Sequence, residues 1–188
     1  GVRKSLMVVD MPYNTYRNPK EAIKNAKLVI KKTKCDAVKL EGGKKIISIV
    51  KSLVKSKIPV MGHLGILPQT EKKFTFKGKK LAERNRILKD AQLLEKAGIF
   101  SVVLECVETK LSKIITETLK VPTIGIGASV YCDGQVLVTD DLIGLSESKF
   151  RFVKKYASTS KLINSAVKKY KSEVIKRQFP KAKHSFKN

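Results

Sequence analysis

The sequence predicts an α/β fold in which parallel strands are joined by crossover helices. Short runs rich in Val, Ile and Leu alternate with longer amphipathic stretches, as expected for strands that return through helices. Polar side chains follow several of these runs directly, and no GxGxxG pattern follows the first run. Because barrel enzymes build their sites at the carboxyl ends of the strands, these observations favour a (β/α)8 TIM barrel over a doubly wound sheet.

Three strands are expected in the first part of the chain. Residues 5–9 form an apolar run that ends at Asp10, and helix 19–34 follows with Asn18 as its N-cap and Pro19 in its first position. Residues 36–40 form the second strand, after which two glycines turn the chain into helix 44–56. The third strand, 58–61, runs into Gly62-His63-Leu64-Gly65.

A long loop, 66 to about 79, leads from the third strand into helix 81–97, which Gly98 closes. Strands are then expected at 101–104, 121–126 and 135–138, with helix 109–119 after the first of these. Polar helices at 149–156 and 161–176 complete the expected elements.

The chain is predicted to be a single domain, 1–188, with C-terminal helices from about residue 149. It contains no internal repeat, no low-complexity segment and no Pro/Gly/Ser linker. A complete barrel has eight strands and roughly 250 residues. Six strands in 188 residues therefore predict an incomplete barrel.

Composition narrows the possible classes of protein. A hydrophobic content of 42% with 30% charged residues is typical of a globular protein. No apolar run reaches the roughly 20 residues of a membrane span, and residues 1–9 lack the features of a secretory signal, so we expect a soluble, cytoplasmic protein. Cys35, Cys106 and Cys132 show no metal-ligand spacing and are expected to be buried, reduced thiols.

The net charge of +24 raises the alternative of a nucleic-acid-binding module. The lysines are scattered along the chain and do not gather in one stripe with aromatic side chains, which is more typical of solvated helix faces. Such a module would show binding that weakens steeply with salt. We therefore do not favour nucleic acid or membrane as partners.

Five side chains at strand ends could carry chemistry: Asp10, Lys39, Glu41, His63 and Glu105. Lys39 and Glu41 are two residues apart and share one face of a strand, and Asp10 could hold a divalent cation through oxygen. Glu105 follows an apolar strand and suits general-base work, while His63 could contact a substrate oxygen. Each side chain also has a structural alternative. Asp10 could be a turn residue, and Lys39 and Glu41 could form an ion pair. His63 could bond to a carbonyl group, and Glu105 could form a salt bridge at the rim.

Two further segments carry weaker signals. The glycine-rich stretch 125–129 could hold an oxyanion through its backbone N–H groups, and Asp140 and Asp141 are expected to cap a helix or loop. Carboxylates and a lysine at the ends of separate strands together predict a divalent-metal enzyme that acts on an oxo acid.

Several motifs resemble those of the ketopantoate hydroxymethyltransferase family. They are VMGHLGILPQ at 60–69, VKLEGG at 38–43, LECV at 104–107, IGIGA at 124–128 with DGQ at 133–135, and Phe179-Pro180 with His184-Ser185-Phe186. They occur in the family's order over nearly the whole chain. Several co-linear motifs of this kind are strongly specific.

The resemblance implies a role for each candidate residue. Asp10 and Glu41 would be Mg²⁺ ligands, Asp10 and Lys39 would contact the oxo acid, Glu105 would be the catalytic base, and His63 would be a further substrate contact. The implied reaction transfers a hydroxymethyl group from 5,10-methylenetetrahydrofolate to 3-methyl-2-oxobutanoate and gives 2-dehydropantoate, in pantothenate biosynthesis. The family also implies a homo-oligomer.

The chain also departs from the family's pattern. It is expected to begin at the third barrel strand, so the first two strands would be absent, together with an Asp-Ser pair after the second. Ser129 stands where a glycine is usual. Two alternatives stay open: a related Mg²⁺-dependent enzyme of the phosphoenolpyruvate mutase and isocitrate lyase kind, although neither Cys106 nor Cys132 lies in a catalytic cysteine motif, and an inactive fragment.

Overall fold

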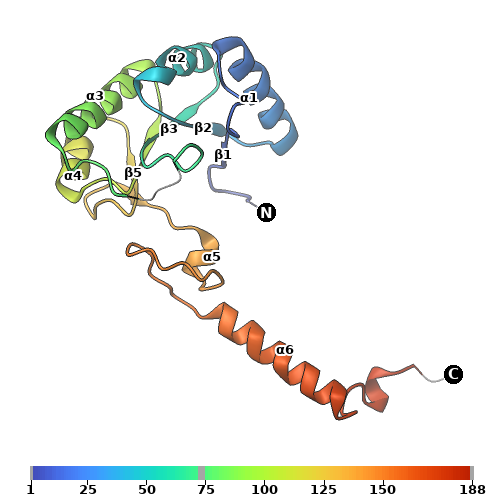
Figure 1. The fold of residues 1–188 in the computed structure, drawn as a ribbon. Helices are drawn as coiled ribbons and strands as arrows, with labels where there is room; N and C mark the ends of the chain where they lie inside the picture. The colour runs from blue at the N-terminus through green and yellow to red at the C-terminus, as the bar shows by residue number, and fades with distance from the viewer. Residues whose placement is uncertain (1, 72–74, 187–188) are drawn as a thin grey trace. The chain divides into compact units, whose positions relative to one another are not determined.

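A computed structural model describes residues 2–71 and 75–186 (Figure 1). The predicted loop 66–79 therefore lies partly outside the described residues. Six parallel strands form one sheet: β1 (Val8–Asp10), β2 (Ala37–Glu41), β3 (Val60–Gly65), β4 (Ser101–Glu105), β5 (Thr123–Ile126) and β6 (Gly134–Gln135). They lie in the sheet in sequence order.

The helices of this sheet lie along one side of it. They are α1 (Pro19–Thr33), α2 (Ile47–Lys55), α3 (Leu81–Ala97) and α4 (Thr109–Thr118), with a short 3₁₀ helix, Lys44–Ile46, before α2. Figure 1 shows α1 to α4 following the outer side of a curled sheet. A doubly wound sheet has helices on both faces and a reversal of strand order. The sequential order with helices outside confirms an α/β fold of the half-barrel kind.

Local signals at the helix ends operate as the sequence predicts. The Asn18 side chain accepts a hydrogen bond from the Glu21 N–H at 2.9 Å, which caps α1, and Pro19 occupies the first turn. Gly98 closes α3 with a φ of 96°, a left-handed conformation that glycine adopts at little cost.

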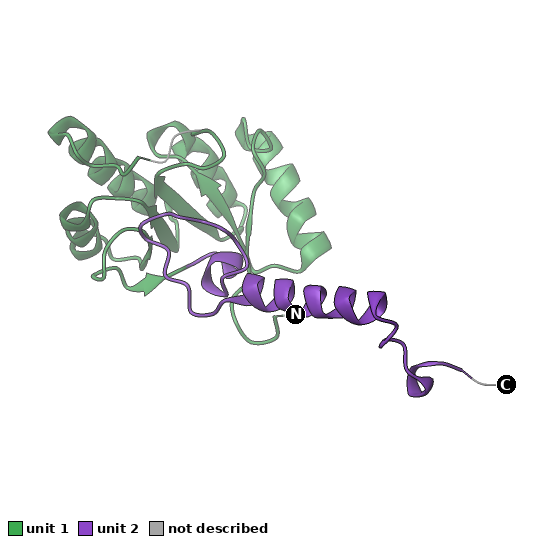
Figure 2. Cartoon of the chain, turned by 60° about the horizontal axis from the view of Figure 1, so that its bottom comes forward, with its two compact units in different colours: residues 1–136 green, residues 137–188 purple. Residues whose placement is uncertain are grey.

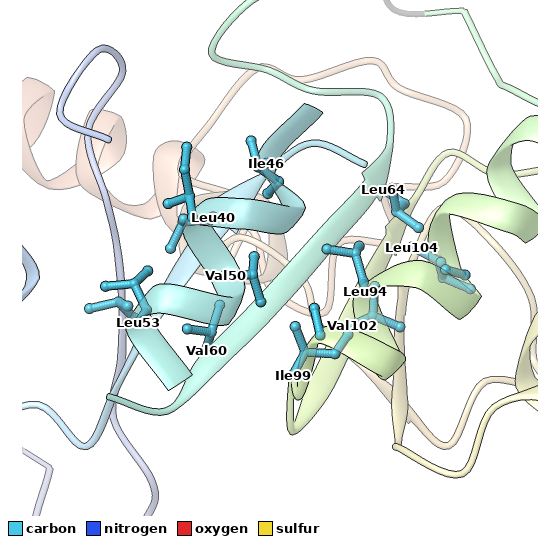
Figure 3. Packing of buried hydrophobic residues seen from close by; sticks show 14 of the residues in the cluster. Leu40, Ile46, Val50, Leu53, Val60, Leu64, Leu94, Ile99, Val102 and Leu104 are labelled. Carbon is cyan, nitrogen blue, oxygen red and sulfur yellow. The ribbon is translucent and has the colours of Figure 1, made fainter. Parts of the chain in front are cut away.

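The core lies between the sheet and the helices. Alternate strand residues point toward the helices and are fully buried, among them Val38, Leu40, Val102 and Leu104. Figure 3 shows strand side chains such as Val102 and Leu104 meeting Leu94 of α3. Since strand side chains alternate between faces, the intervening residues project away from the helices. The polar candidates occupy these intervening positions.

β3 extends further than the sequence predicts. The expected strand stops at residue 61, whereas the ladder continues through His63 to Gly65. Glycine and histidine are weak strand formers, but β2 and β4 supply hydrogen-bonding partners on both sides. A Cβ on Gly62 would lie 3.3 Å from the Leu94 and Ile99 side chains, so a glycine here allows the close approach of α3.

Residues 1–136 and 137–188 form two compact units (Figure 2), each of which is described by itself. The second unit contains α5 (Thr139–Leu142), α6 (Thr159–Ile175) and a 3₁₀ helix, Ala182–His184. Asp140 and Asp141 lie inside the first turn of α5, and Asp141 accepts a hydrogen bond from the Ser146 hydroxyl. None of the helices in the described ranges is long and apolar enough to cross a membrane.

The predicted helix at 149–156 is wrong. The described chain there has a turn, closed by the Val153 N–H and the Phe150 carbonyl oxygen at 3.0 Å. The rings of Phe150 and Phe152 stack with their centroids 5.6 Å apart. Side chains two residues apart do not face each other on a helix, so this stacking requires a non-helical backbone.

Glu108 links α3 to α4. As the N-cap of α4 its carboxylate accepts hydrogen bonds from the N–H groups of Lys110 at 3.0 Å and Leu111 at 2.9 Å, and it pairs with Arg84 of α3. Burial by itself would raise its pKa, but the two backbone donors and Arg84 outweigh it and lower the pKa. A lowered pKa means that the carboxylate stabilises the fold above its unfolded pKa.

We expect Glu108→Ala to lower the free energy of unfolding by about 1 kcal/mol at neutral pH, because α4 loses its cap. The difference from wild type should shrink as the pH falls through the lowered pKa of Glu108, where the cap becomes protonated. Urea titrations at several pH values measure both effects. Glu117→Ala, which removes an exposed ion pair with Lys113 on the same helix, is the control and should cost less than about 0.5 kcal/mol. Equal losses in the two variants would contradict a capping role.

Candidate active site at the carboxyl ends of the strands

The strand register brings all five candidate residues to one edge of the sheet. Asp10 pairs with Lys39, and Glu41 pairs with His63, in neighbouring parallel strands. Glu105 lies at the last position of β4, next to the end of β3. Paired residues of parallel strands project to the same side, so the five side chains share the face that points away from the helices.

Lys39 lies at the centre of this cluster. Its Nζ is 3.0 Å from Oδ1 of Asp10 and 3.3 Å from Nδ1 of His63. An ammonium group can only donate, so Nδ1 of a neutral His63 accepts and the ring proton is placed on Nε2. The Asp10 side chain is 58% exposed, which leaves one side of its carboxylate open to a ligand.

His63 is buried and presents a polar atom that lacks a partner. Its Nε2 lies 3.2 Å from Oε2 of Glu105, but the two groups are not aligned for a hydrogen bond. Among the described residues, Nε2 is one of two buried side-chain polar atoms without a hydrogen-bond partner, the other being Oγ of Ser148. A buried N–H group without a partner costs free energy. The Nε2–H of the ring is therefore available to donate to a ligand bound beside His63 and Glu105.

Glu41 is held by two neighbours. Its Oε2 accepts a hydrogen bond from the backbone N–H of Gln69 at 3.2 Å, and its Oε1 lies 3.8 Å from Nδ1 of His63. Burial raises the pKa of Glu41, and this effect exceeds the opposite influence of His63, Gln69 and Lys39. The carboxylate form is thus destabilised, and a cation at this position would stabilise it.

The sequence did not single out two residues of the site, Tyr16 and Gln69. The Tyr16 hydroxyl donates to Oε1 of Gln69 at 3.2 Å, and Nε2 of Gln69 donates to the Met11 carbonyl oxygen at 3.0 Å. Both residues lie in loops, where hydrophobic periodicity gives no signal. Gln69 is the last residue of the longest family motif, 60–69, and this position is the one signal in the sequence that could have indicated its role.

The turns at the ends of β3 and β4 bring the two strands close together. The Ile66 N–H donates to the Glu105 carbonyl oxygen at 2.8 Å. Gly65 has a φ of 100°, and a Cβ there would collide with that carbonyl. Glycine is therefore required at Gly65 for the backbone next to Glu105 to take this position.

Cys106, which directly follows Glu105, is not suited to act as a nucleophile. Cys35, Cys106 and Cys132 are free and buried, as expected. Burial, and secondarily the charge of Glu105, raise the pKa of Cys106 to about 11, so its thiol stays protonated at neutral pH. This argues against the related enzymes that use a catalytic cysteine loop.

The glycine-rich stretch after β5 is held by its own side chains. Asp133 accepts hydrogen bonds from the Thr123 N–H at 2.8 Å and the Thr123 hydroxyl at 3.1 Å, and Gln135 donates to the Ser129 carbonyl oxygen at 2.7 Å. The DGQ motif therefore shapes this loop, and its oxyanion role stays a prediction.

The donor set can be compared with the needs of a metal ion. In the described ranges there is no group of three or more His, Cys, Asp or Glu side chains that could hold a metal. Mg²⁺ commonly binds to one or two carboxylates and takes its other ligands from water and substrate. Asp10 and Glu41, at the ends of adjacent strands, provide two such oxygen donors. They fit Mg²⁺ bound together with a substrate.

Comparison with known proteins identifies the family of the chain. The family model described as ketopantoate hydroxymethyltransferase matches residues 1–182. A 3-methyl-2-oxobutanoate hydroxymethyltransferase of Pelagibacter ubique is 68% identical, over 99% of this chain and 72% of the relative. Enzymes of the same name from Clostridium kluyveri and Syntrophomonas wolfei are 46% and 43% identical, over 100% and 98% of this chain and 69% and 68% of theirs. The chain belongs to the ketopantoate hydroxymethyltransferase family, a family of transferase enzymes.

Proposed function

We propose that the chain transfers a hydroxymethyl group from 5,10-methylenetetrahydrofolate to 3-methyl-2-oxobutanoate and gives 2-dehydropantoate, with Mg²⁺ as cofactor. The relatives' names support the type of transfer. The observation that carries the proposal is the cluster around Lys39, in which carboxylates on both sides flank a buried histidine whose Nε2 has no hydrogen-bond partner. Such a cluster suits an oxo acid that is negatively charged at one end.

Binding of the oxo acid is proposed to use four side chains. Asp10 and Glu41 would hold Mg²⁺, which when bound supplies Lewis-acid stabilisation of negative charge on the substrate oxygens. Lys39 would turn its ammonium group toward the substrate carboxylate and offset its charge. The Nε2–H of His63 would donate to a substrate oxygen, which satisfies the buried donor.

Glu105 is proposed as the base that removes the C3 proton. Its side chain is largely buried beside His63, and it enters from β4, across the site from Asp10 on β1. A carboxylate that lies within reach of a substrate carbon can take up its proton as a general base. The enolate left after proton removal would then attack the one-carbon unit of the folate.

Proton NMR of 3-methyl-2-oxobutanoate in D₂O tests this function without folate. We expect the C3 proton signal to disappear when the protein and Mg²⁺ are present, and to persist when a chelator is added. A folded sample that leaves the C3 signal unchanged at saturating Mg²⁺ would argue against the activity of this chain and favour the inactive fragment. The correspondence of β1 to the third strand of an eight-stranded barrel, and the expected Asp-Ser pair, stay predictions.

We also propose that the chain works as a homo-oligomer in the cytoplasm. Helix α6 exposes a series of apolar side chains that a subunit contact could cover: Leu162, Ile163, Val167, Tyr170, Val174 and Ile175. Sedimentation equilibrium of the full chain is expected to show a mass above one subunit. Replacing Val167 and Tyr170 by Ser should lower that mass, and a wild-type chain that sediments as a monomer would contradict the proposal.

A further inference from the structure

Gln69 contacts three residues from two segments of the site. Its backbone N–H donates to Oε2 of Glu41 at the end of β2. Its side-chain Nε2 donates to the carbonyl oxygen of Met11, the residue that follows Asp10. Its Oε1 accepts the hydroxyl of Tyr16, further along the same loop. One residue thus uses both ends of its amide and its own backbone.

Thr70 and Glu71, the next two residues after Gln69, bond within their own turn through their backbone N–H groups. The N–H groups of Thr70 and Glu71 donate to the Leu67 carbonyl oxygen at 3.0 and 2.9 Å, which closes the turn on itself. The loop begins at Ile66, whose N–H is bound to the end of β4. The turn is therefore anchored to β4 at its start and to the β1 and β2 segments through Gln69.

The surroundings of Gln69 favour a fixed geometry. Met11 is 1% exposed, and its own N–H donates to the Lys39 carbonyl oxygen at 3.0 Å, so the acceptor of Gln69 belongs to a rigid part of the sheet. Burial raises the pKa of Tyr16, which keeps its hydroxyl protonated and able to donate. Both hydrogen bonds of the Gln69 amide have partners of the right type.

We propose that Gln69 is a positioning residue that fixes the carboxylates of Asp10 and Glu41 relative to each other. The side chain holds the turn against the segment that follows Asp10, and the backbone N–H then fixes one oxygen of Glu41. The inference rests on the proposed function for its purpose, since the aligned carboxylates would receive Mg²⁺. The coupling of the turn to Met11 and Glu41 does not depend on the proposed function, because it follows from the hydrogen bonds alone.

Hydrogen exchange tests the coupling without any activity. In the wild-type chain the Gln69 amide should be protected, because it is bound to a carboxylate whose side chain is largely buried. We expect Gln69→Ala to accelerate exchange at residue 69 by roughly tenfold, the equivalent of one lost hydrogen bond or two. Thr70→Ala is the matched control, since the Thr70 hydroxyl bonds only weakly within the turn, at 3.4 Å. Unchanged protection in folded Gln69→Ala would overturn the proposal.

Binding of Mn²⁺ alone, measured by electron paramagnetic resonance, tests whether Gln69 aligns the carboxylates for a metal ion. We expect Gln69→Ala to weaken Mn²⁺ binding by roughly tenfold and Thr70→Ala to leave it within about twofold. Tyr16→Phe removes a single donor to Gln69 and should have an intermediate effect that is not additive with Gln69→Ala. Should Gln69→Ala fail to fold, Tyr16→Phe carries the same test.

The outcomes separate the two proposals. If the wild-type chain binds Mn²⁺ and the Gln69 variant does so more weakly, the positioning role is supported even when no C3 exchange is seen, and the proposed reaction alone fails. Equal Mn²⁺ affinity in wild type, Gln69→Ala and Tyr16→Phe would overturn the positioning role, whatever the result of the C3 exchange experiment.

Discussion

Replacing Glu105 by Gln is expected to lower the rate of C3 proton exchange by roughly 10²–10⁴-fold, the usual contribution of a general base. Glutamine has the same shape and can still accept a hydrogen bond, but it cannot take up the proton. Because the change leaves Asp10, Lys39 and Glu41 in place, Mg²⁺-dependent binding of 3-methyl-2-oxobutanoate should stay within about threefold of wild type. Proton NMR in D₂O gives the first quantity and calorimetry the second.

Measuring exchange and binding together distinguishes a catalytic base from a residue that only binds the substrate or the metal ion. Glu117→Gln, an exposed change on α4, is the control and should leave both quantities unchanged. A parallel fall of exchange and binding in Glu105→Gln would place the carboxylate among the binding groups and remove it as the base. An unchanged exchange rate would show that another group takes the proton.

The sequence predicted those parts of the fold that depend on neighbouring residues. The caps at Asn18 and Gly98 are local interactions, and both are found where expected. The common face of Lys39 and Glu41 follows from the two-residue period of a strand, and the meeting of separate strand ends follows from their parallel direction. These rules were sufficient to predict that the five candidate residues lie at one edge of the sheet.

What the sequence missed depends on contacts between distant residues. Gln69 lies in a loop, and its importance comes from Met11 and Glu41, 58 and 28 residues away in the chain. The extra length of β3 depends on partners in β2 and β4, which override the weak strand preference of glycine. The helix predicted at 149–156 is replaced by a turn, in which the rings of Phe150 and Phe152 stack.

The exchange Glu41→Gln is expected to weaken Mg²⁺ binding by at least about tenfold and to weaken oxo-acid binding with it. Loss of groups that only support a metal ligand commonly costs 10–100-fold, so loss of the charge on a ligand should cost no less. Glutamine keeps an acceptor for the Gln69 N–H, so the turn should stay in place. Calorimetric titration with Mg²⁺, with and without 3-methyl-2-oxobutanoate, measures both affinities.

The same change should not destabilise the metal-free protein. Burial raises the pKa of Glu41 in the folded chain, so at neutral pH its charged form opposes folding, and this cost is relieved as the pH falls through the raised pKa. A neutral glutamine removes the cost, and the free energy of unfolding should stay equal or increase. A carboxylate that weakens the fold but strengthens metal binding is expected of a functional group. If Glu41→Gln lowered stability and left Mg²⁺ affinity intact, Glu41 would instead be a structural ion-pair partner of His63.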